Sequence, residues 1–411
     1  MNRELLKARL GKLPHLPALD TPAELDPDEE EEMLDSFPTG SSTTSTVSLT
    51  SKNRRARSRQ DLSPLSAEGY FAQALQVQVP VSNVYPSSID TESSTTPVVF
   101  RVYYTAPAIS TSPDDADDVQ NSNGVVFVCV HGAGYSGLSY ACMAKSLTGQ
   151  SGGRVGVLAY DARGHGKTNM PPSQNKGEQT SMNLESMAQD LINLLKTVYP
   201  SRDEAPGLVL VGHSMGGAVV AEACNRIQSS VADVLGVTVI DVVEGTALEA
   251  LSSMSTLIAA QPKVFDSREA AIGWHLDSRT INNVTSARIS VPALISPLSE
   301  AQDAQAEDIE YGWTVDLAKT EPYWKGWFTG LSSKFLGCKT AKLLILAGTD
   351  RLDRDLLIGQ MQGKYQLEVF PEAGHCVHED NPERTAETLL SFWERNDRTD
   401  VLKGVKKVGE L

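Results

Sequence analysis

The sequence has few cysteines and no long apolar segment. Its five cysteines are scattered along 411 residues without a C-x-x-C pair, so we expect reduced thiols and neither a disulfide framework nor a zinc site. No stretch approaches the roughly 20 apolar residues of a membrane-spanning helix. Residues 1–17 also lack the apolar core of a signal peptide. We therefore expect an intracellular protein, in the cytoplasm, the nucleus or both, with no metal and no association with membranes.

Positive charge is scarce as well. The chain has 36 lysines and arginines against 52 aspartates and glutamates, which gives a formal net charge of −16. A surface of this sign repels phosphate backbones and anionic lipids. Nucleic acid and bare membrane are therefore poor candidates for partners, whereas the charge says nothing about the fold.

Apolar residues are sparse in the first 66 residues, which the sequence predicts to be a disordered tail. An acidic run covers residues 24–32, a Ser/Thr tract covers 41–51, and a basic cluster covers 52–59. The basic cluster is typical of a solvated linker, with a nuclear-import signal or a contact for an acidic partner as alternatives. We place the folded domain at residues 67–411.

The rest of the chain alternates between two kinds of pattern. Continuous apolar runs rich in β-branched residues predict buried strands at 98–104, 124–130, 155–160, 208–211, 237–243, 342–347 and 366–370. Helical spacing or composition predicts helices at 184–195, 215–227 and 385–393. Strands that alternate with helices predict an α/β fold, with a mostly parallel sheet flanked by helices.

One segment, residues 261–333, departs from this alternation. It holds four tryptophans, and its stretch 294–311 is polar and acidic. We interpret it as a cap inserted over the carboxyl edge of the sheet, with a loose loop inside. Pockets form at such junctions and aromatic side chains often line them. The alternative is that the tryptophans only pack the cap onto the body of the domain.

A G-x-S-x-G motif lies between a predicted strand and a predicted helix. It covers residues 212–216, with Ser214 at its centre. In this context the serine lies on a sharp strand-to-helix turn that exposes its hydroxyl, and the flanking glycines let the backbone close. The N–H groups of the helix N-terminus lie beside it. The motif therefore predicts Ser214 as a catalytic nucleophile.

The loop after the predicted strand 124–130 reads H-G-A-G. A loop of this kind turns one backbone N–H toward the oxyanion that forms during acyl transfer. We expect this donor to be Ala133, and the second donor to be Met215, the residue after the nucleophile. His131 is expected to hold the loop through hydrogen bonds of its side chain, and His213 to pack or to line the pocket.

A serine hydroxyl is nearly inert at neutral pH, so the chemistry needs a base beside it. His375 follows the last predicted strand and precedes the terminal helix, where a sheet of this kind delivers its histidine. His378, one helical turn away, is the alternative. We favour His375 because Gly374 before it permits the required turn.

The acid that orients this histidine has two candidate positions. Asp350 and Asp353 follow the predicted strand 342–347, and Asp241 lies within or at the end of the predicted strand 237–243. Burying Asp241 among valines and an isoleucine would be costly without a partner, and a histidine that becomes cationic is such a partner. The alternative is a structural aspartate that caps a loop.

Taken in order, these elements resemble the α/β-hydrolase fold with an inserted cap. Beyond that fold, the chain closely resembles the protein phosphatase methylesterase family from about residue 61 to residue 393. The resemblance rests on long and unusual blocks, at 208–218, 240–251, 317–331, 347–356, 358–365 and 374–380. It is therefore more specific than the G-x-S-x-G motif alone.

The resemblance implies a complete site and a substrate. In that family the aspartate that matches Asp241 completes the triad, which leaves Asp350 and Asp353 with roles in shaping their loop. Family members remove the methyl ester from the C-terminal leucine of the catalytic subunit of protein phosphatase 2A, and they need no cofactor. The segment around Gln360 and Met361 belongs to the part of the family that contacts the phosphatase.

Two departures and two alternatives accompany this resemblance. Residues 294–311 look shorter than the acidic insert of animal relatives, and the tail up to about residue 52 matches only weakly. A small-molecule esterase or lipase would use the same machinery, but a lipase should have a broad apolar lid. A binding protein that sequesters the phosphatase is the other alternative, and the candidate triad argues against it. We expect the free protein to be a monomer.

Overall fold

The computed structural model describes residues 61–79, 98–108, 124–170, 181–298, 309–348 and 352–397. All of them belong to one compact unit that begins at Asp61. The acidic run, the Ser/Thr tract and the basic cluster lie outside the described residues, so the disordered tail stays a prediction. The boundary between the tail and the folded domain also stays a prediction. The guanidinium of Arg288 binds Asp61 and Ser63, and the carbonyl oxygen of Arg288 accepts from the Leu65 N–H. These contacts favour a boundary nearer residue 60 than residue 66.

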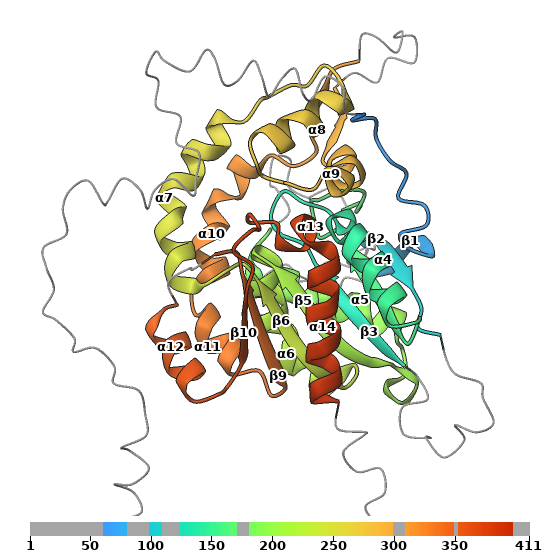
Figure 1. Ribbon diagram of the computed structural model, residues 1–411, viewed down its shortest axis with the longest axis vertical. Coiled ribbons are helices and arrows are strands. Elements are labelled where there is room, and N and C mark those ends of the chain that lie inside the picture. The colour runs from blue at the N-terminus through green and yellow to red at the C-terminus, as the bar shows by residue number, and fades with distance from the viewer. Residues whose placement is uncertain are drawn as a thin grey trace, which may run out of the picture. The chain divides into compact units, whose positions relative to one another are not determined.

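Eight strands of the described residues form one sheet. This sheet runs through the middle of the domain, between the flanking helices (Figure 1). Strands β1 and β2 are antiparallel, β2 and β4 are antiparallel, and the remaining neighbours are parallel. The strands follow the order β1 (Gln73–Val79), β2 (Val98–Thr105), β4 (Val155–Tyr160), β3 (Val125–Val130), β5 (Gly207–His213), β6 (Val234–Ile240), β9 (Ala341–Leu346) and β10 (Gln366–Val369). The mostly parallel sheet confirms the predicted α/β fold.

Each predicted strand is present, and two differences are informative. Strand β6 spans Val234–Ile240, three residues earlier than the predicted 237–243, because the backbone at Asp241 has a φ of 52° and leaves the sheet. Strand β1 was not predicted. It is an edge strand whose side chains are mostly exposed, so its sequence QALQVQV lacks the continuous apolar run that marks a buried strand.

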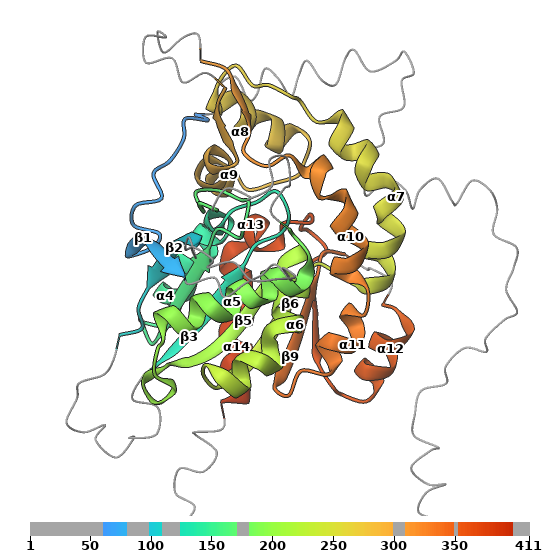
Figure 2. The ribbon, with the colours of Figure 1, turned by 180° about the vertical axis from the view of Figure 1, so that it is seen from behind.

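Helices cover both faces of the sheet. Helices α5 (Leu184–Val198) and α6 (Met215–Ser230) lie on one face, and α4 (Ala141–Gln150) and α14 (Pro382–Asn396) lie on the other (Figures 1 and 2). Helices α5, α6 and α14 were predicted, and α4 was not. Alternate residues of each central strand point to opposite faces, so both faces are apolar and the core has two layers.

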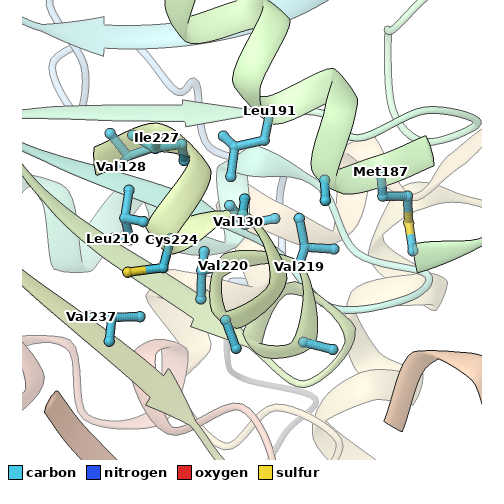
Figure 3. Packing of buried hydrophobic residues seen from close by; sticks show 14 of the residues in the cluster. Val128, Val130, Met187, Leu191, Leu210, Val219, Val220, Cys224, Ile227 and Val237 are labelled. Carbon is cyan, nitrogen blue, oxygen red and sulfur yellow. The ribbon is translucent and has the colours of Figure 1, made fainter. Parts of the chain in front are cut away.

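The α6 side of this core is closely interdigitated. Figure 3 shows side chains of β3, β5 and β6 that meet the apolar faces of α5 and α6, with Val128, Val130, Leu210 and Val237 from the strands and Met187, Leu191, Val219, Val220, Cys224 and Ile227 from the helices. All of these side chains are buried. Because α6 starts directly after β5, this packing fixes the turn between them.

Most of the chain between β6 and β9 lies at one end of the sheet, where it forms helices and a short hairpin (Figure 1). Its elements are α7 (Glu244–Ala260), α8 (Arg268–Asp277), α9 (Val284–Ser290), β7 (Ile295–Pro297), β8 (Tyr311–Trp313), α10 (Glu321–Phe328) and α11 (Leu331–Leu336). Residues 299–308 of the polar loop lie outside the described residues. The limits 261–333 that we gave to the cap stay a prediction, since helical structure continues beyond both of them.

The tryptophans of this segment pack rather than line a pocket. Trp324 and Trp327 are buried, and their indole N–H groups donate to Thr320 Oγ1 and Met182 O, each at 2.7 Å. Trp274 and Trp313 stack edge-on at 5.7 Å between ring centroids, in an apolar cluster with Phe265 and Ile272. The alternative interpretation, that these side chains hold the cap together and onto the body, accounts for them. Every helix in the described part of the chain is too short or too polar to span a lipid bilayer.

Candidate active site

The turn between β5 and α6 has the strained geometry that the motif predicts. Ser214 has φ 50° and ψ −118°, a conformation that side-chain-bearing residues rarely adopt. A Cβ atom on Gly212 would lie 2.2 Å from Gly216 O, and one on Gly216 would lie 2.0 Å from Val130 O. Only glycine fits at either position. The Ser214 N–H donates to Ile240 O at 3.0 Å, which ties the turn to the end of β6.

The H-G-A-G loop lies against this turn. A Cβ atom on Gly132 would be 3.3 Å from Ser214 Cβ, so the loop approaches the serine as closely as a glycine allows. The Tyr135 N–H closes a turn onto Gly132 O at 3.2 Å, with Gly134 at φ 80°, and the Gly134 N–H donates to His165 Nε2 at 3.0 Å. That bond leaves the N–H of Ala133 as the donor at the tip of the turn.

The second predicted donor, Met215, is the first residue of α6. The N–H groups of the first helical turn have no acceptor within the helix, so this one is available to a bound anion. Among the described residues, neither Ala133 nor Met215 has a hydrogen-bond acceptor for its N–H group. Their roles as oxyanion donors stay predictions that this geometry favours.

His131 holds its loop in place, as the sequence predicts. Its side chain is buried, Nδ1 donates to Gly132 O at 2.7 Å, and Nε2 accepts from the Ala162 N–H at 2.9 Å. Burial, with His165 nearby, lowers the pKa of His131 to about 3. The ring is therefore neutral and fully occupied by structural hydrogen bonds.

His375 lies on the loop between β10 and α13 (Val377–Asp380), and its side chain is 50% exposed. Its Nδ1 donates to Asp241 Oδ2 at 2.7 Å. We expected Gly374 to supply an unusual backbone turn, but Gly374 has no positive φ. The position is crowded instead, because a Cβ there would lie 3.2 Å from both Asn282 Nδ2 and Asp380 Oδ2.

The alternative base, His378, is buried in α13. Its ring stacks on Tyr140 at 4.3 Å between centroids, and neither ring nitrogen has a hydrogen-bond partner among the described residues. Burial, followed by the nearby His375, lowers the pKa of His378 to about 3. A neutral ring that is sealed in the core does not present a nitrogen to substrate, so the geometry favours His375.

Asp241 directly follows β6, and its side chain is 9% exposed. Its carboxylate is satisfied on both oxygens, since Oδ2 binds His375 and Oδ1 accepts from the Ala347 N–H at 2.7 Å. Its own N–H donates to Ile345 O at 2.7 Å. The partner that burial of this aspartate requires is therefore the histidine.

The competing acids take other places. Asp353 caps α12 (Arg354–Met361), where Oδ1 accepts from the Leu356 N–H at 3.0 Å and Oδ2 accepts from the Ser332 hydroxyl. Asp350 lies outside the described residues. Helix α12 also carries the predicted partner-binding residues Gln360 and Met361, and Met361 is 89% exposed. Figures 1 and 2 show α12 beside α11, apart from the loop that leads into α13.

No role was assigned from the sequence to Asp380, the last residue of the block 374–380. Asp380 accepts three hydrogen bonds of 2.7 Å, from the N–H of Gly374 and from both the backbone and side-chain nitrogens of Asn282. It thus joins the loop of His375 to the connection between α8 and α9. No local pattern distinguishes this aspartate from an exposed acid on a short helix. One of its partners, Asn282, is 98 residues away, and the other, Gly374, lies in a loop without regular structure.

Comparisons with known proteins agree with the fold. Residues 127–388 match the model of the alpha/beta hydrolase family. Similar solved structures include E-2-(acetamidomethylene)succinate hydrolase, with a TM-score of 0.56 and 17% identity over 78% of this chain and 100% of that one. The peroxisomal alpha-beta-hydrolase Lpx1 of Saccharomyces cerevisiae gives 0.55 and 16% over 83% and 93%. The chain is therefore a member of the alpha/beta hydrolases.

Relatives of higher identity define the branch. Protein phosphatase methylesterase 1 of Cryptococcus neoformans is 40% identical over 96% of this chain and 93% of its own length. The proteins of that name from Neurospora crassa and Aspergillus fumigatus are 36% and 37% identical over 98% and 97% of this chain, and over 96% and 89% of their own lengths. The chain belongs to the protein phosphatase methylesterase 1 family, and it is a carboxylic ester hydrolase.

Proposed function

We propose that this protein hydrolyses the methyl ester on the C-terminal leucine of the catalytic subunit of protein phosphatase 2A. Its triad consists of Ser214, His375 and Asp241. The observation that carries the proposal is the 2.7 Å bond between His375 and Asp241 beside the strained turn of Ser214. The kinship with protein phosphatase methylesterases over nearly the whole chain supports the substrate.

The first half of the reaction forms an acyl-enzyme. Ser214 Oγ attacks the ester carbonyl while His375 Nε2 takes the hydroxyl proton, and the N–H groups of Ala133 and Met215 bind the oxyanion. His375 then gives that proton to the methoxy group, which leaves as methanol. Asp241 holds the ring with Nδ1 protonated, so that Nε2 is the nitrogen directed to the serine, and it stabilises the imidazolium.

The second half releases the carboxylate. His375 takes a proton from water, the resulting hydroxide attacks the acyl carbon, and the same two N–H groups bind the second oxyanion. When this intermediate collapses, the proton returns from His375 to Ser214 Oγ and the leucine carboxylate is freed. The cycle consumes one water and needs no cofactor.

The phosphatase is expected to dock partly on α12. This helix exposes Leu357, Ile358 and Met361, which are three of the six large hydrophobic side chains that are exposed among the described residues. Large apolar side chains grouped on one exposed surface are typical of protein interfaces. We assign the partner-binding role to this surface, with Gln360 beside it, and we assign a monomeric state to the free protein.

Two alternatives have less support. A lipase-like esterase should carry a broad apolar lid. In the described part of the cap, Trp324 and Trp327 are buried, and Trp274 and Trp313 are half-buried in a packed apolar cluster. A protein that only sequesters the phosphatase would have no use for a buried aspartate bonded to a half-exposed histidine. In the experiment below, turnover of the small ester alone is the outcome expected of the first alternative, and turnover of neither substrate is the outcome expected of the second.

The test compares two substrates, the carboxymethylated catalytic subunit of phosphatase 2A and p-nitrophenyl acetate. We expect Ser214→Ala to abolish turnover of both, while Ser229→Ala, a change on the exposed end of the same helix, leaves both intact. Hydrolysis of the small ester alone by the wild type would leave a serine esterase with another substrate. Full activity of Ser214→Ala would contradict the mechanism.

A second pair of variants tests the docking surface in the same assay. Met361→Glu places a charge on the most exposed of the apolar side chains, and we expect it to lower kcat/KM for the phosphatase about tenfold or more, a typical loss for an interface residue. The rate with p-nitrophenyl acetate should not change. Leu75→Glu, on the edge strand β1, is the matched control and should leave both rates unchanged.

A further inference from the structure

His213, the residue before the proposed nucleophile, is joined to the proposed base. It ends β5, its ring is buried, and its Nε2–H donates to His375 O at 2.9 Å. The two rings lie 4.6 Å apart between centroids. A hydrogen bond between residues separated by 162 positions therefore links the segment of the nucleophile to the segment of the base.

The surroundings of His213 fix both its charge and its tautomer. Burial, followed by the nearby His375 and His378, holds the pKa of His213 well below its ordinary value, so the ring is neutral. Since Nε2 donates to a carbonyl oxygen, Nδ1 carries the lone pair. Nδ1 is buried without a hydrogen-bond partner among the described residues, and a Cβ atom on Gly132 would lie 2.8 Å from it.

The ring is thus enclosed on several sides. The H-G-A-G loop lies against Nδ1, and the rings of Tyr135 and His378 approach to 5.6 Å and 4.7 Å between centroids. A neutral imidazole at such a position leaves one polar nitrogen unsatisfied, which an apolar side chain of similar shape would avoid. The feature that an apolar side chain cannot supply is the N–H donated to His375 O.

We propose that His213 is a positioning residue, whose hydrogen bond to the main chain of His375 sets the separation between base and nucleophile. The backbone of His213 is fixed by β5, whereas His375 lies on a loop and its side chain is half exposed. A tie from the strand to the carbonyl of that loop transfers the rigidity of the sheet to the base. The inference rests on the proposed triad, and it goes beyond the packing role that the sequence indicated.

The experiment uses three single variants of the full chain. His213→Phe keeps a flat ring and removes the donor, whereas His213→Gln keeps an amide N–H at about the reach of Nε2. His275→Phe is the matched control, because His275 is also a buried histidine with a side-chain hydrogen bond, to Ala271 O, in α8. For each variant, kcat and KM for p-nitrophenyl acetate, the rate of labelling by a fluorophosphonate, the pH profile and Tm are measured.

We expect His213→Phe to lower kcat about 100-fold with KM nearly unchanged, the scale of loss that a misplaced catalytic group produces. Labelling by the fluorophosphonate should slow by a similar factor. The acid limb of the kcat/KM profile should move to lower pH, since a displaced His375 loses part of its support from Asp241. His213→Gln should recover about tenfold or more of the loss, and His275→Phe should change Tm without changing kcat.

Three outcomes would overturn the inference. One is a His213→Phe variant with wild-type kcat and an unshifted acid limb, and another is a His213→Gln variant that is as slow as His213→Phe at equal Tm. If His213→Phe does not fold, His213→Asn replaces it. The third outcome that would overturn the inference is then an equal kcat for His213→Asn and His213→Gln. Failure of the proposed triad is a separate result, since Ser214→Ala would then still be labelled by the fluorophosphonate.

Discussion

The loops after β6 and β9 start at neighbouring parallel strands, and each carries an aspartate that the sequence offers as the catalytic acid. In the first loop, Asp241 turns out of the sheet at φ 52° and binds His375. In the second, Asp353 lies seven residues beyond the strand and caps a helix. The same carboxylate chemistry therefore serves two purposes, according to how far each side chain lies from the strand end.

The second loop also supports the first. The Ala347 N–H, directly after β9, donates to Asp241 Oδ1, and the Asp241 N–H donates back to Ile345 O within β9. Strand β9 thus contributes backbone groups that hold the carboxylate, but not the carboxylate itself. The comparison shows that the end of a strand can position a catalytic side chain through backbone hydrogen bonds without contributing a catalytic side chain of its own.

Among the changes that test the difference between the two loops, Asp241→Asn has the largest expected effect. This variant keeps the shape of the side chain but removes the charge that stabilises an imidazolium and selects its tautomer. We expect kcat for p-nitrophenyl acetate to fall about 10⁴-fold, as in other triads that lose the acid. Steady-state kinetics on the purified variant measures this loss. A loss smaller than tenfold would move the acid to the loop after β9, with Asp350 as the first candidate.

An intermediate effect is expected at a buried carboxyl group. Glu379 in α13 is fully buried, and the side chains of Ser290 and Cys376, which act to lower its pKa, do not offset that burial. Burial, with Asp380 nearby, raises the pKa of Glu379 from its ordinary value of 4.5 to about 8. Between these values the folded state keeps a proton that the unfolded state loses, so this residue makes stability fall as pH rises.

Glu379→Gln removes this ionisation and keeps the shape. We expect the variant to gain stability relative to the wild type as pH rises from about 5 to 8, by an amount on the order of a few kcal/mol. Urea unfolding at pH 5, 6.5 and 8 measures the difference. Parallel stability curves for the two proteins would show that the buried group is not the source of the pH dependence.

The smallest effect is expected for Asp353→Ala. The variant loses the cap of α12 and the bond to Ser332. We expect stability to fall by about 1 kcal/mol, as for other helix caps, and kcat for p-nitrophenyl acetate to stay within about twofold of the wild type. Urea unfolding and steady-state kinetics give both numbers. A loss of kcat comparable to that of Asp241→Asn would remove the distinction between the two loops.

Much of the fold was predictable because its signals are local. The buried strands β3, β4 and β9 are marked by continuous apolar runs, and the structure places each within about one residue of the predicted range. The edge strand β1 escaped because half-exposed strands lack such runs. The end of β6 was misplaced because Val242 and Val243 continue the apolar pattern after the chain has left the sheet, and both side chains are buried.

The sequence by itself determined the turn of Ser214, since Gly212, Ser214 and Gly216 lie within five residues and a Cβ at either glycine would collide with backbone. Only the tertiary structure decided which acid meets His375, because the order of strands in the sheet brings Asp241 and His375 together across 134 residues of chain. The same holds for His213 and His375. The steric limits of a turn depend on residues that are adjacent in the sequence, whereas a contact between distant strand ends depends on the packing of the whole sheet.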